Sequence, residues 1–149
     1  MKLEFSGSPE IDAPREKVWQ RLMDPHFVAK SAPGVESVEI IDPTHFKVIS
    51  GFGVGSIKLR FTMDVELFDI VPGRSARMRV RGKAPGSALD VLSSLEIQDA
   101  GPDKVRLSWS ATSEISGTVA GVGARLMEGT ARKLTEQFWT DFARRVSQE

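Results

Sequence analysis

Residues 57–83, IKLRFTMDVELFDIVPGRSARMRVRGK, alternate between apolar and polar side chains over most of their length. A period of two is typical of a β-strand with one covered face and one solvated face. The segment VPGR at 71–74 interrupts the alternation with residues that favour a turn. The stretch therefore predicts an antiparallel hairpin whose second strand carries Arg77, Arg79 and Arg81 on its solvated face.

Alternation of the same kind continues on both sides of this hairpin. We expect further strands at residues 38–40, 46–52, 89–97 and 105–115, and a first strand at residues 2–11. The connecting segments are short and rich in Pro, Gly and Asp, as an antiparallel meander requires. Counting back from the VPGR turn places Asp64 opposite Arg79. The same register places Glu66 opposite Arg77, so cross-strand ion pairs of about 0.2–1 kcal/mol each are expected.

Two short helices are expected between the first two strands. Asp12 can accept hydrogen bonds from the first amides of a helix, and Pro14 has no amide hydrogen to leave unpaired there. They predict a helix at residues 14–22. Asp24 and Pro25 repeat the signal and predict a second helix at residues 25–31.

After Gly117 the apolar side chains recur at intervals of three and four, which predicts a helix of about thirty residues. The stripe consists of Val119, Val122, Leu126, Met127, Leu134, Phe138, Phe142 and Val146. Only the inward face of the strand meander offers this stripe a complementary surface. We therefore predict an α+β fold, in which a curved antiparallel sheet of about seven strands wraps around a long C-terminal helix. A single domain is expected to span residues 1–149.

The segment GVGARL at residues 121–126 is similar to the dinucleotide-binding fingerprint G-x-G-x-x-G. Leu126 occupies the third glycine position, and too few residues follow for a βαβ unit. Phosphate binding is therefore not expected. The glycines are expected to face the aromatic side chains of the strands, where they would either create space or allow close packing.

The composition limits the classes of function. Twenty basic and twenty acidic residues leave no net charge, so the charge gives no indication of nucleic-acid binding. The chain has no Cys, which excludes disulfides, thiolate chemistry and cysteine-type zinc sites. It has no apolar run of the ~18 residues that span a membrane, and its start does not resemble a signal peptide. A soluble, cytoplasmic protein is expected.

Candidate catalytic groups are scarce on the inward faces. The polar side chains expected there are Ser50, Ser93, Ser113 and Thr130. No base stands in register to activate these hydroxyls. His26 and His45 lack metal-ligand spacing and are expected to be surface or capping side chains. No catalytic residue, metal or cofactor is therefore assigned, and an enzyme that depends on Ser50 or Thr130 stays open as an alternative.

Large apolar side chains gather on the inward strand faces, whereas the start of the long helix is rich in Gly and Ala. This combination predicts an apolar internal cavity in the usual ligand range of about 300–1,000 Å³. The expected ligand-binding wall is Phe46, Phe52, Phe61, Met63, Met78, Trp109, Met127 and Leu134. A fully packed core is the alternative that the pattern leaves open.

Basic residues outnumber acidic ones in the hairpin, and four of them gather at one of its ends without counter-charges nearby in the sequence. They are Lys58, Arg60, Arg81 and Lys83. Such a cluster predicts either a solvated face or a docking surface for an acidic partner or an anionic membrane. Exposed aromatic residues, which would favour single-stranded nucleic acid, are not expected beside it.

Four segments spread over the whole chain resemble the CoxG family, the G-type subunits of carbon monoxide dehydrogenase. They are FSGSPEIDAPREKVW (5–19), LMDPHFVAKSAPGVESVE (22–39), GFGVGSIKLRF (51–61) and AGVGARLMEGTARKLTEQFW (120–139). The most specific pieces are Asp24-Pro25, Ala32-Pro33-Gly34, Val54-Gly55 and the glycine-bearing start of the last helix.

The resemblance implies the helix-grip fold of the START/Bet v 1-like superfamily and a cavity for a hydrophobic ligand such as a quinone. It also implies an accessory role for a CO dehydrogenase-type molybdenum hydroxylase, in assembly, membrane recruitment or quinone delivery. Some relatives look as if they carry a C-terminal extension that reaches a membrane, whereas this chain ends in RRVSQE. Peripheral membrane contact would then fall to the basic end of the hairpin.

The wider superfamily also includes polyketide cyclases and aromatic hydrolyase-like enzymes. Their cavities normally display polar groups, which this inward register largely lacks. We therefore expect a non-enzymatic protein that binds a quinone- or lipid-like molecule. An enzyme of the same superfamily and a docking factor with a filled core are the two alternatives.

Overall fold

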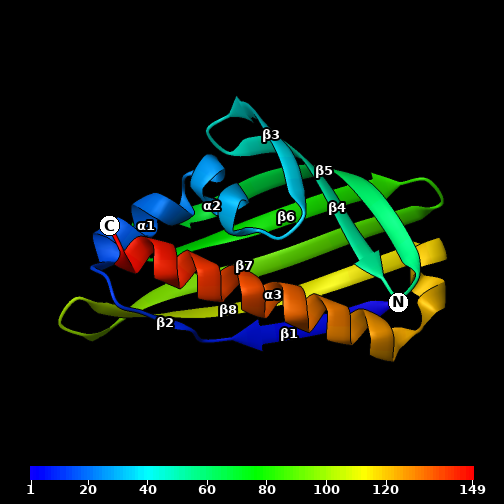
Figure 1. Cartoon of the computed structure of the whole chain (residues 1–149). Coiled ribbons are helices and arrows are strands. Elements are labelled where there is room, and N and C mark those ends of the chain that lie inside the picture. The colour runs from blue at the N-terminus through cyan, green and yellow to red at the C-terminus, as the bar shows by residue number, and fades with distance from the viewer.

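A computed structural model describes all 149 residues of the chain and consists of one antiparallel sheet with three α-helices (Figure 1). The strands are β1 (Lys2–Gly7), β2 (Glu10–Ile11), β3 (Val35–Asp42), β4 (His45–Val54), β5 (Ile57–Val71), β6 (Ser75–Ala84), β7 (Ser87–Gly101) and β8 (Lys104–Gly117). The helices are α1 (Arg15–Leu22), α2 (Pro25–Ser31) and α3 (Ala124–Ser147), with a 3₁₀ turn η1 (Thr118–Val122) before α3.

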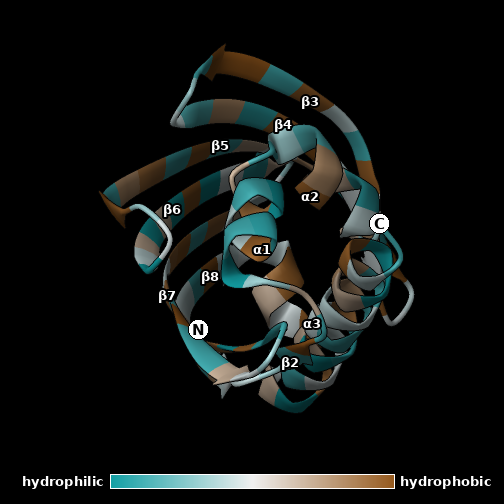
Figure 2. Cartoon of the chain, turned by 90° about the vertical axis from the view of Figure 1, so that its left-hand side faces the viewer, coloured by the Kyte–Doolittle hydropathy of each residue, from teal (hydrophilic) through white to brown (hydrophobic).

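The sheet has the strand order β1-β8-β7-β6-β5-β4-β3, and β2 also pairs with β8. It curls around α3, which crosses its concave side, while α1 and α2 lie at one end beside the C-terminus (Figures 1 and 2). The predicted α+β helix-grip architecture is thus confirmed. Eight strands are present instead of about seven because the first predicted strand divides at Pro9, which has no amide hydrogen for a sheet ladder.

The long hairpin of β5 and β6 has the predicted faces but another register. Asp64 pairs with Arg81 and Glu66 with Arg79, two positions further along β6 than the sequence count placed them. The count centred the turn between Val71 and Pro72, whereas Val71 pairs with Ser75, which moves the partners three positions along β6. One extra residue of β5 between Phe68 and Val71, where Asp69 adopts a φ of 49°, takes one of these positions back.

The two short helices begin differently from each other. The Asp24 side chain accepts hydrogen bonds from the amides of His26 at 3.1 Å and Phe27 at 3.3 Å, so the predicted start of α2 is confirmed. The predicted cap of α1 is wrong. Pro14 occupies the N-cap position without a side-chain hydrogen bond, and the Asp12 carboxylate lies 3.6 Å from Lys104 Nζ.

The C-terminal helix is shorter than predicted, because Gly117 and Gly123 have φ values of 87° and 99° and interrupt it on both sides of η1. Helix α3 therefore has 24 residues, or about 36 Å at 1.5 Å per residue. The expectation that its glycines face the aromatic strands is also wrong. A Cβ atom added at Gly121 or Gly129 would meet no atom within 4 Å, so both face open space. None of the helices combines the length and hydrophobicity that a membrane span needs.

Two separate hydrophobic clusters hold the sheet and helices together. The first lies beside α1 and the end of α3, around Val18, Leu107 and Phe142. The second lies beside the start of α3, around Phe61 and Met127. Between the two clusters, the inner face of the sheet is less tightly packed and could accommodate a binding site.

Candidate functional site

The structure contains an apolar cavity between α2 and the inner face of strands β3 to β6, with a volume of about 200 Å³, which is smaller than the predicted range. The helical segment contributes Leu22, Met23, Pro25, Val28, Ala29 and Ala32. The strands contribute Val35, Val38, Phe46, Val48, Met63, Val65, Leu67, Met78 and Val80. None of these 15 side chains is polar, so the cavity offers a ligand shape and removal from water and no acid, base or nucleophile.

Local sequence explains this wall. Alternation along β4, β5 and β6 turns every second side chain inward, and the cross-strand pairs Phe46–Val65 and Val65–Val80 lie side by side on that face. Gly82 lets Met63 lie flat on the sheet, since a Cβ atom at Gly82 would come within 3.0 Å of Met63 Cγ. Apolar residues of α2 form the opposite wall. The hydrogen bonds to the Asp24 side chain fix the residue at which α2 begins.

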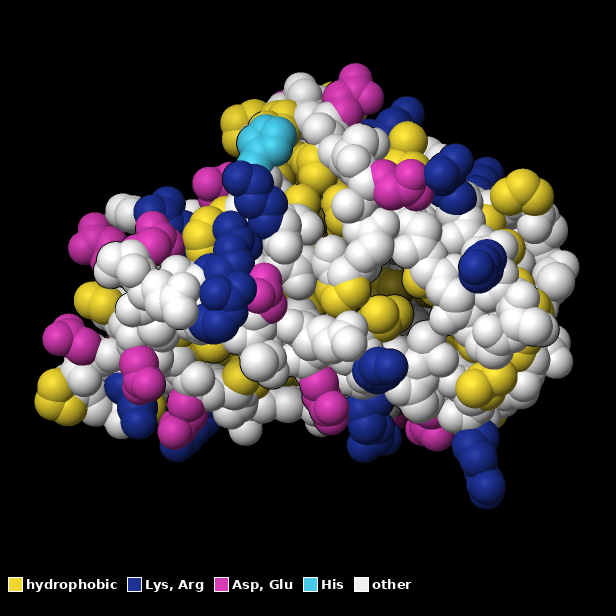
Figure 3. All heavy atoms as spheres, in the orientation of Figure 1, with side chains coloured by type: hydrophobic (Ala, Val, Ile, Leu, Met, Phe, Trp, Pro, Cys, Tyr) yellow, Lys and Arg dark blue, Asp and Glu magenta, His cyan; other side chains and the backbone are white.

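The interior beneath α3 is not closed by packing. Only 22 of the 149 residues are buried, and most of them belong to the two clusters at the ends of the molecule. The inward side chains of the middle of the sheet, such as Val48, Met63, Met78 and Val91, are only half-buried. Figure 3 shows a hollow with hydrophobic side chains inside it, between α3 and the arm of the sheet that contains β3 and β4.

The eight predicted wall residues occupy four places. Phe46, Met63 and Met78 line the cavity. The remaining five lie elsewhere: Phe52, Phe61 and Met127 in or against the second cluster, Trp109 beside Trp139 of α3, and Leu134 half-buried on α3. The alternating pattern predicts which face of the sheet a side chain lies on, but not whether it borders the cavity or a packed cluster. The eight predicted residues are therefore found in different places.

The wall supplied by α1 and α2 was not predicted from the sequence. Its signal was present in the apolar residues Leu22, Val28 and Ala32, which lie on or beside the two short helices, although Leu22 and Val28 also pack against the first cluster. Their assignment requires the position of α2 above the sheet, which only the tertiary structure gives.

A second hollow lies on the other side of α3, against β1, and has a volume of about 510 Å³. Phe5, Trp109 and Trp139 form its apolar part, with the two tryptophan ring centroids 6.4 Å apart, and Arg132 and Glu136 lie among its polar lining. Trp109 Nε1 is buried without a hydrogen-bond partner, because the chain at Gly7 covers it closely. This groove has a polar rim that the cavity under α2 lacks.

The inward hydroxyl groups fall into two kinds. Ser87 Oγ accepts a hydrogen bond from the Val119 amide at 3.1 Å, and Ser31 Oγ accepts one from Arg145. Ser50, Ser93 and Ser113 form no hydrogen bond with the protein through their side chains, although Ser50 and Ser113 are buried. Thr130, which was also predicted to face inward, is half-buried on α3.

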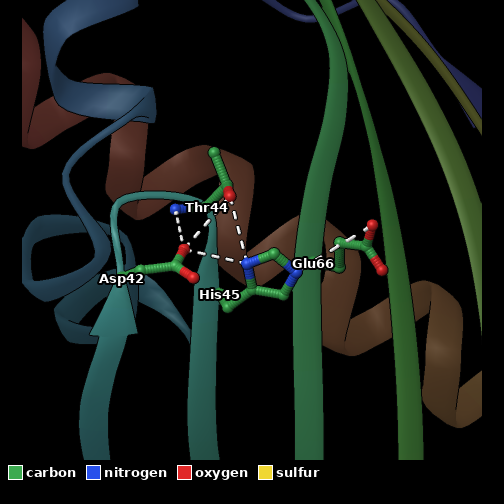
Figure 4. Close-up of polar contacts among 4 residues, drawn as sticks. All are labelled: Asp42, Thr44, His45 and Glu66. Atoms are coloured by element: carbon green, nitrogen blue, oxygen red, sulfur yellow. Dashed lines mark hydrogen bonds and ion pairs between the residues drawn. The ribbon is translucent and has the colours of Figure 1, made fainter.

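His45 lies on the surface at the turn between β3 and β4, as the sequence indicates (Figure 4). Its Nδ1 lies 2.8 Å from Asp42 Oδ1 and 3.1 Å from Thr44 Oγ1, and its Nε2 lies 4.0 Å from Glu66 Oε1. The hydrogen bond to Asp42 raises the pKa of His45 and lowers the pKa of Asp42. Both close contacts use Nδ1, so His45 is not placed to relay a proton from Thr44 to Asp42.

The four basic residues predicted for docking share the outward face of β5 and β6, but two of them have counter-charges. Arg60 forms a bidentate ion pair with Glu36 of β3, with N–O distances of 2.9 and 3.0 Å. Arg81 Nε lies 3.9 Å from Asp90 Oδ2 of β7. The expectation of a cluster without local counter-charges is therefore wrong for Arg60 and Arg81, because their partners come from other strands. Lys58 and Lys83 are the exposed cations of the cluster that form no ion pair.

Comparisons with known proteins agree with this geometry. The profile of the CoxG family, described as the G subunit of carbon monoxide dehydrogenase, matches residues 7–147. Among curated proteins, none matches this sequence. A conserved protein from Geobacillus kaustophilus has a similar structure with a TM-score of 0.92 and 25% identity, over 98% of this chain and 96% of that one.

Two more distant structures share the fold. The ZhuI aromatase/cyclase from a Streptomyces species has a TM-score of 0.75 and 15% identity, over 99% of this chain and 95% of that one. A START superfamily protein from Mycobacterium smegmatis has a TM-score of 0.74 and 13% identity, over 97% of each chain. These likenesses show that the chain shares the fold of a START superfamily protein.

Proposed function

The chain belongs to the CoxG family of carbon monoxide dehydrogenase G-type subunits, and we propose that it is a non-enzymatic accessory protein that binds a hydrophobic, quinone- or lipid-like molecule. In this proposal residues 1–149 form one binding domain, which assists a CO dehydrogenase-type molybdenum hydroxylase in the cytoplasm. Assembly, membrane recruitment and electron-acceptor delivery are the roles open to such a protein. An apolar cavity favours delivery, since a carried molecule needs a place removed from water.

The observation that carries the proposal is the wholly apolar wall of the cavity under α2. Its volume of about 200 Å³ exceeds that of an engineered apolar cavity of about 150 Å³ that holds benzene. A ring-sized group that buries about 150–250 Å² would gain roughly 4–6 kcal/mol at 25 cal/mol per Å², before the cost of association. A longer ligand would extend into the hollow beneath α3.

The proposed ligand site keeps five of the eight residues named from the sequence and adds the wall of α2. Phe46, Met63 and Met78 would contact a ring inside the cavity, and Phe52 and Leu134 would contact a chain that continues beneath α3. Phe61 and Met127 are buried in the second cluster and Trp109 lies beside Trp139 on the other side of α3, so these three are not part of the site. These roles give shape and exclusion of water, so no step of chemistry is assigned to them.

An enzyme is the second candidate, because the ZhuI aromatase/cyclase has the same fold. Such an activity would have to depend on an inward hydroxyl such as Ser50 or Thr130. A docking factor with a filled core is the third candidate. It would bind no small molecule at all.

Native mass spectrometry of freshly purified protein tests the proposal. A retained lipid-like adduct is expected, and titration with 2-methyl-1,4-naphthoquinone (menadione) should quench the tryptophan fluorescence. Met63→Glu should abolish the quenching, because a charge in an apolar cavity is strongly disfavoured. Thr62→Glu places the same charge on the adjacent, exposed residue and is the control.

Circular dichroism must show that both variants are folded. Absence of an adduct together with absence of quenching in the wild-type protein would refute ligand binding. Turnover of a polyketide-like substrate that is lost in Ser50→Ala or Thr130→Ala would favour the enzyme.

We also propose that the outward face of β5 and β6 docks onto an acidic surface of the partner enzyme. Lys58 and Lys83 would make the main contacts, since they have no ion pair within the chain. Arg60 and Arg81 would support them from the positions at which Glu36 and Asp90 hold them.

A further inference from the structure

We propose that Ser93 and Ser113 bind the polar end of the ligand whose apolar part occupies the cavity under α2. The inference rests on the proposed function and adds a preference among ligands to it. The protein would prefer apolar molecules that carry a hydrogen-bond-accepting oxygen, such as a ring carbonyl, over hydrocarbons of the same shape.

The sheet register places both serines on the continuation of the cavity wall. Met78 lines the cavity, and its cross-strand partner on β7 is Ser93. Val80 also lines it, pairs with Val91 on β7, and Val91 pairs in turn with Ser113 on β8. Directly paired residues point to the same face of a sheet, so both hydroxyl groups lie on the inner face, Ser93 beside the cavity wall and Ser113 one strand further from it.

Small side chains leave room for a ligand at this place. Ser93 pairs with Ala111, and Ser113 is the neighbour of Ala111 two positions along β8. Three adjacent inward positions thus carry side chains no larger than a hydroxymethyl group. In the two clusters at the ends of the molecule, the corresponding inward positions carry larger residues such as Leu107 and Ile115.

Both hydroxyl groups are free and within reach of a ligand. Neither forms a hydrogen bond within the protein, and Trp109 Nε1 is the sole side-chain nitrogen or oxygen that is fully occluded without a partner. The hydroxyl groups of Ser93 and Ser113 therefore keep some accessible surface, although Ser113 is only 9% exposed. Ser87 shows the contrast, since its hydroxyl is occupied by the Val119 amide.

This arrangement discriminates between ligands through desolvation. A hydrocarbon that fills the space displaces water from the two hydroxyl groups and leaves them unpaired, which is costly in an apolar interior. A ligand with an oxygen at the same place accepts their hydrogen bonds and avoids that cost. Sites built to pair with a polar group reject an analogue that lacks it far better than sites that merely fit a shape.

The experiment compares menadione with 2-methylnaphthalene, which has the same two fused rings and methyl group but no oxygen. Dissociation constants are measured for the wild-type protein and for the double variant Ser93→Ala/Ser113→Ala. We expect the double variant to bind menadione about fivefold or more weakly and 2-methylnaphthalene equally well or more tightly, since each net hydrogen bond supplies a factor of this order. Ser94→Ala/Ser110→Ala removes two hydroxyl groups from the outward face of the same two strands and should leave the ratio of the two constants unchanged.

The outcomes separate the inference from the function on which it rests. If the wild-type protein binds neither probe, the proposed ligand-binding function is wrong. If it binds both, and the double variant keeps the same ratio of dissociation constants, only the role of Ser93 and Ser113 is wrong. The single variants Ser93→Ala and Ser113→Ala, each expected to give part of the change, provide the same comparison if the double variant does not fold.

Discussion

The guanidinium group of Arg145, on α3, lies over the ring of Phe27, on α2, with 3.9 Å between its central carbon and the ring centroid. Arg145 Nη1 also donates to the Phe27 carbonyl at 2.7 Å and to Ser31 Oγ at 2.5 Å. One side chain thus holds α2 at both of its turns against α3. Because α2 forms a wall of the apolar cavity, this contact also holds the cavity closed on that side.

Arg145→Ala should loosen α2 and destabilise the protein. It removes two charge-assisted hydrogen bonds and a cation–π contact, and it leaves the buried Ser31 hydroxyl without its partner. We expect a loss of about 1–3 kcal/mol in the free energy of unfolding, measured by urea denaturation. Amide hydrogen exchange within α2 should accelerate more than exchange within β7.

Arg144→Ala is the matched control, because Arg144 is the adjacent residue and forms an exposed ion pair with Asp141 within α3. Exposed pairs of this kind contribute little, so the change should stay within about 0.5 kcal/mol. Equal losses in the two variants would show that Arg145 has no special role in holding α2.

The glycines of the C-terminal segment should respond oppositely to substitution by Ala. Gly129 lies within α3 and faces open space, so Gly129→Ala should raise the free energy of unfolding by up to ~1 kcal/mol through helix propensity. Gly123 has a φ of 99°, which side chains rarely adopt, so Gly123→Ala should lower it by about 1 kcal/mol or more. Thermal unfolding of the two variants measures both changes, and stabilisation by Gly123→Ala would contradict the conformation described for η1.

The sequence predicts the helices, the strands and the inward face of each strand better than it predicts which residues of different strands are neighbours. Alternation along residues 57–67 correctly identifies the inward side chains of β5, because the period of a strand depends only on the local backbone. The predicted partner of Asp64 was wrong by two residues, since neither the pairing of Val71 with Ser75 at the turn nor the one-residue bulge near Asp69 has a clear local signal. The ion pair between Arg60 and Glu36 was missed for a related reason, because it joins residues of different strands.

The residues of the cavity were also predicted only in part. Phe46, Met63 and Met78 could be assigned to it from inward alternation, whereas Phe52 and Phe61 alternate equally well but stack on each other in the second cluster, with centroids 5.2 Å apart. Which inward residues border empty space depends on where α2 and α3 press on the sheet. That position follows from long-range contacts, which a one-dimensional pattern does not contain.

The contact between His45 and Asp42 should make stability depend on pH. The hydrogen bond to Asp42 raises the pKa of His45 in the folded state, so the stabilisation is fully present below the unfolded value of about 6.5. It is lost as the pH rises through the folded pKa. At the acid end, the lowered pKa of Asp42 keeps the contact until the pH falls through that pKa.

An NMR titration of the His45 ring measures this effect. Asp42→Asn should lower the pKa of His45 clearly, because the hydrogen bond to Asp42 is the largest cause of the shift. Glu66→Gln should lower it less, since Glu66 acts only through its charge at 4.0 Å. A larger effect of Glu66→Gln would contradict the geometry of Figure 4.

The outward lysines of β5 and β6 provide the test of docking. Lys58→Glu/Lys83→Glu reverses two exposed charges without breaking an ion pair, whereas changes at Arg60 or Arg81 would also release Glu36 or Asp90. The double variant should bind a purified CO dehydrogenase-type molybdenum hydroxylase at least tenfold more weakly in low salt. The loss should shrink as ionic strength rises, because surface charges are screened within about 8 Å at 0.15 M salt.

The control is Lys30→Glu/Lys133→Glu, which makes the same change of net charge on α2 and α3. It should leave the affinity for the enzyme unchanged if docking uses the outward face of the sheet. Vesicles that contain phosphatidylglycerol provide a second comparison. If Lys58→Glu/Lys83→Glu removes binding to vesicles and not to the enzyme, the surface contacts an anionic membrane, and docking onto an acidic partner protein is wrong.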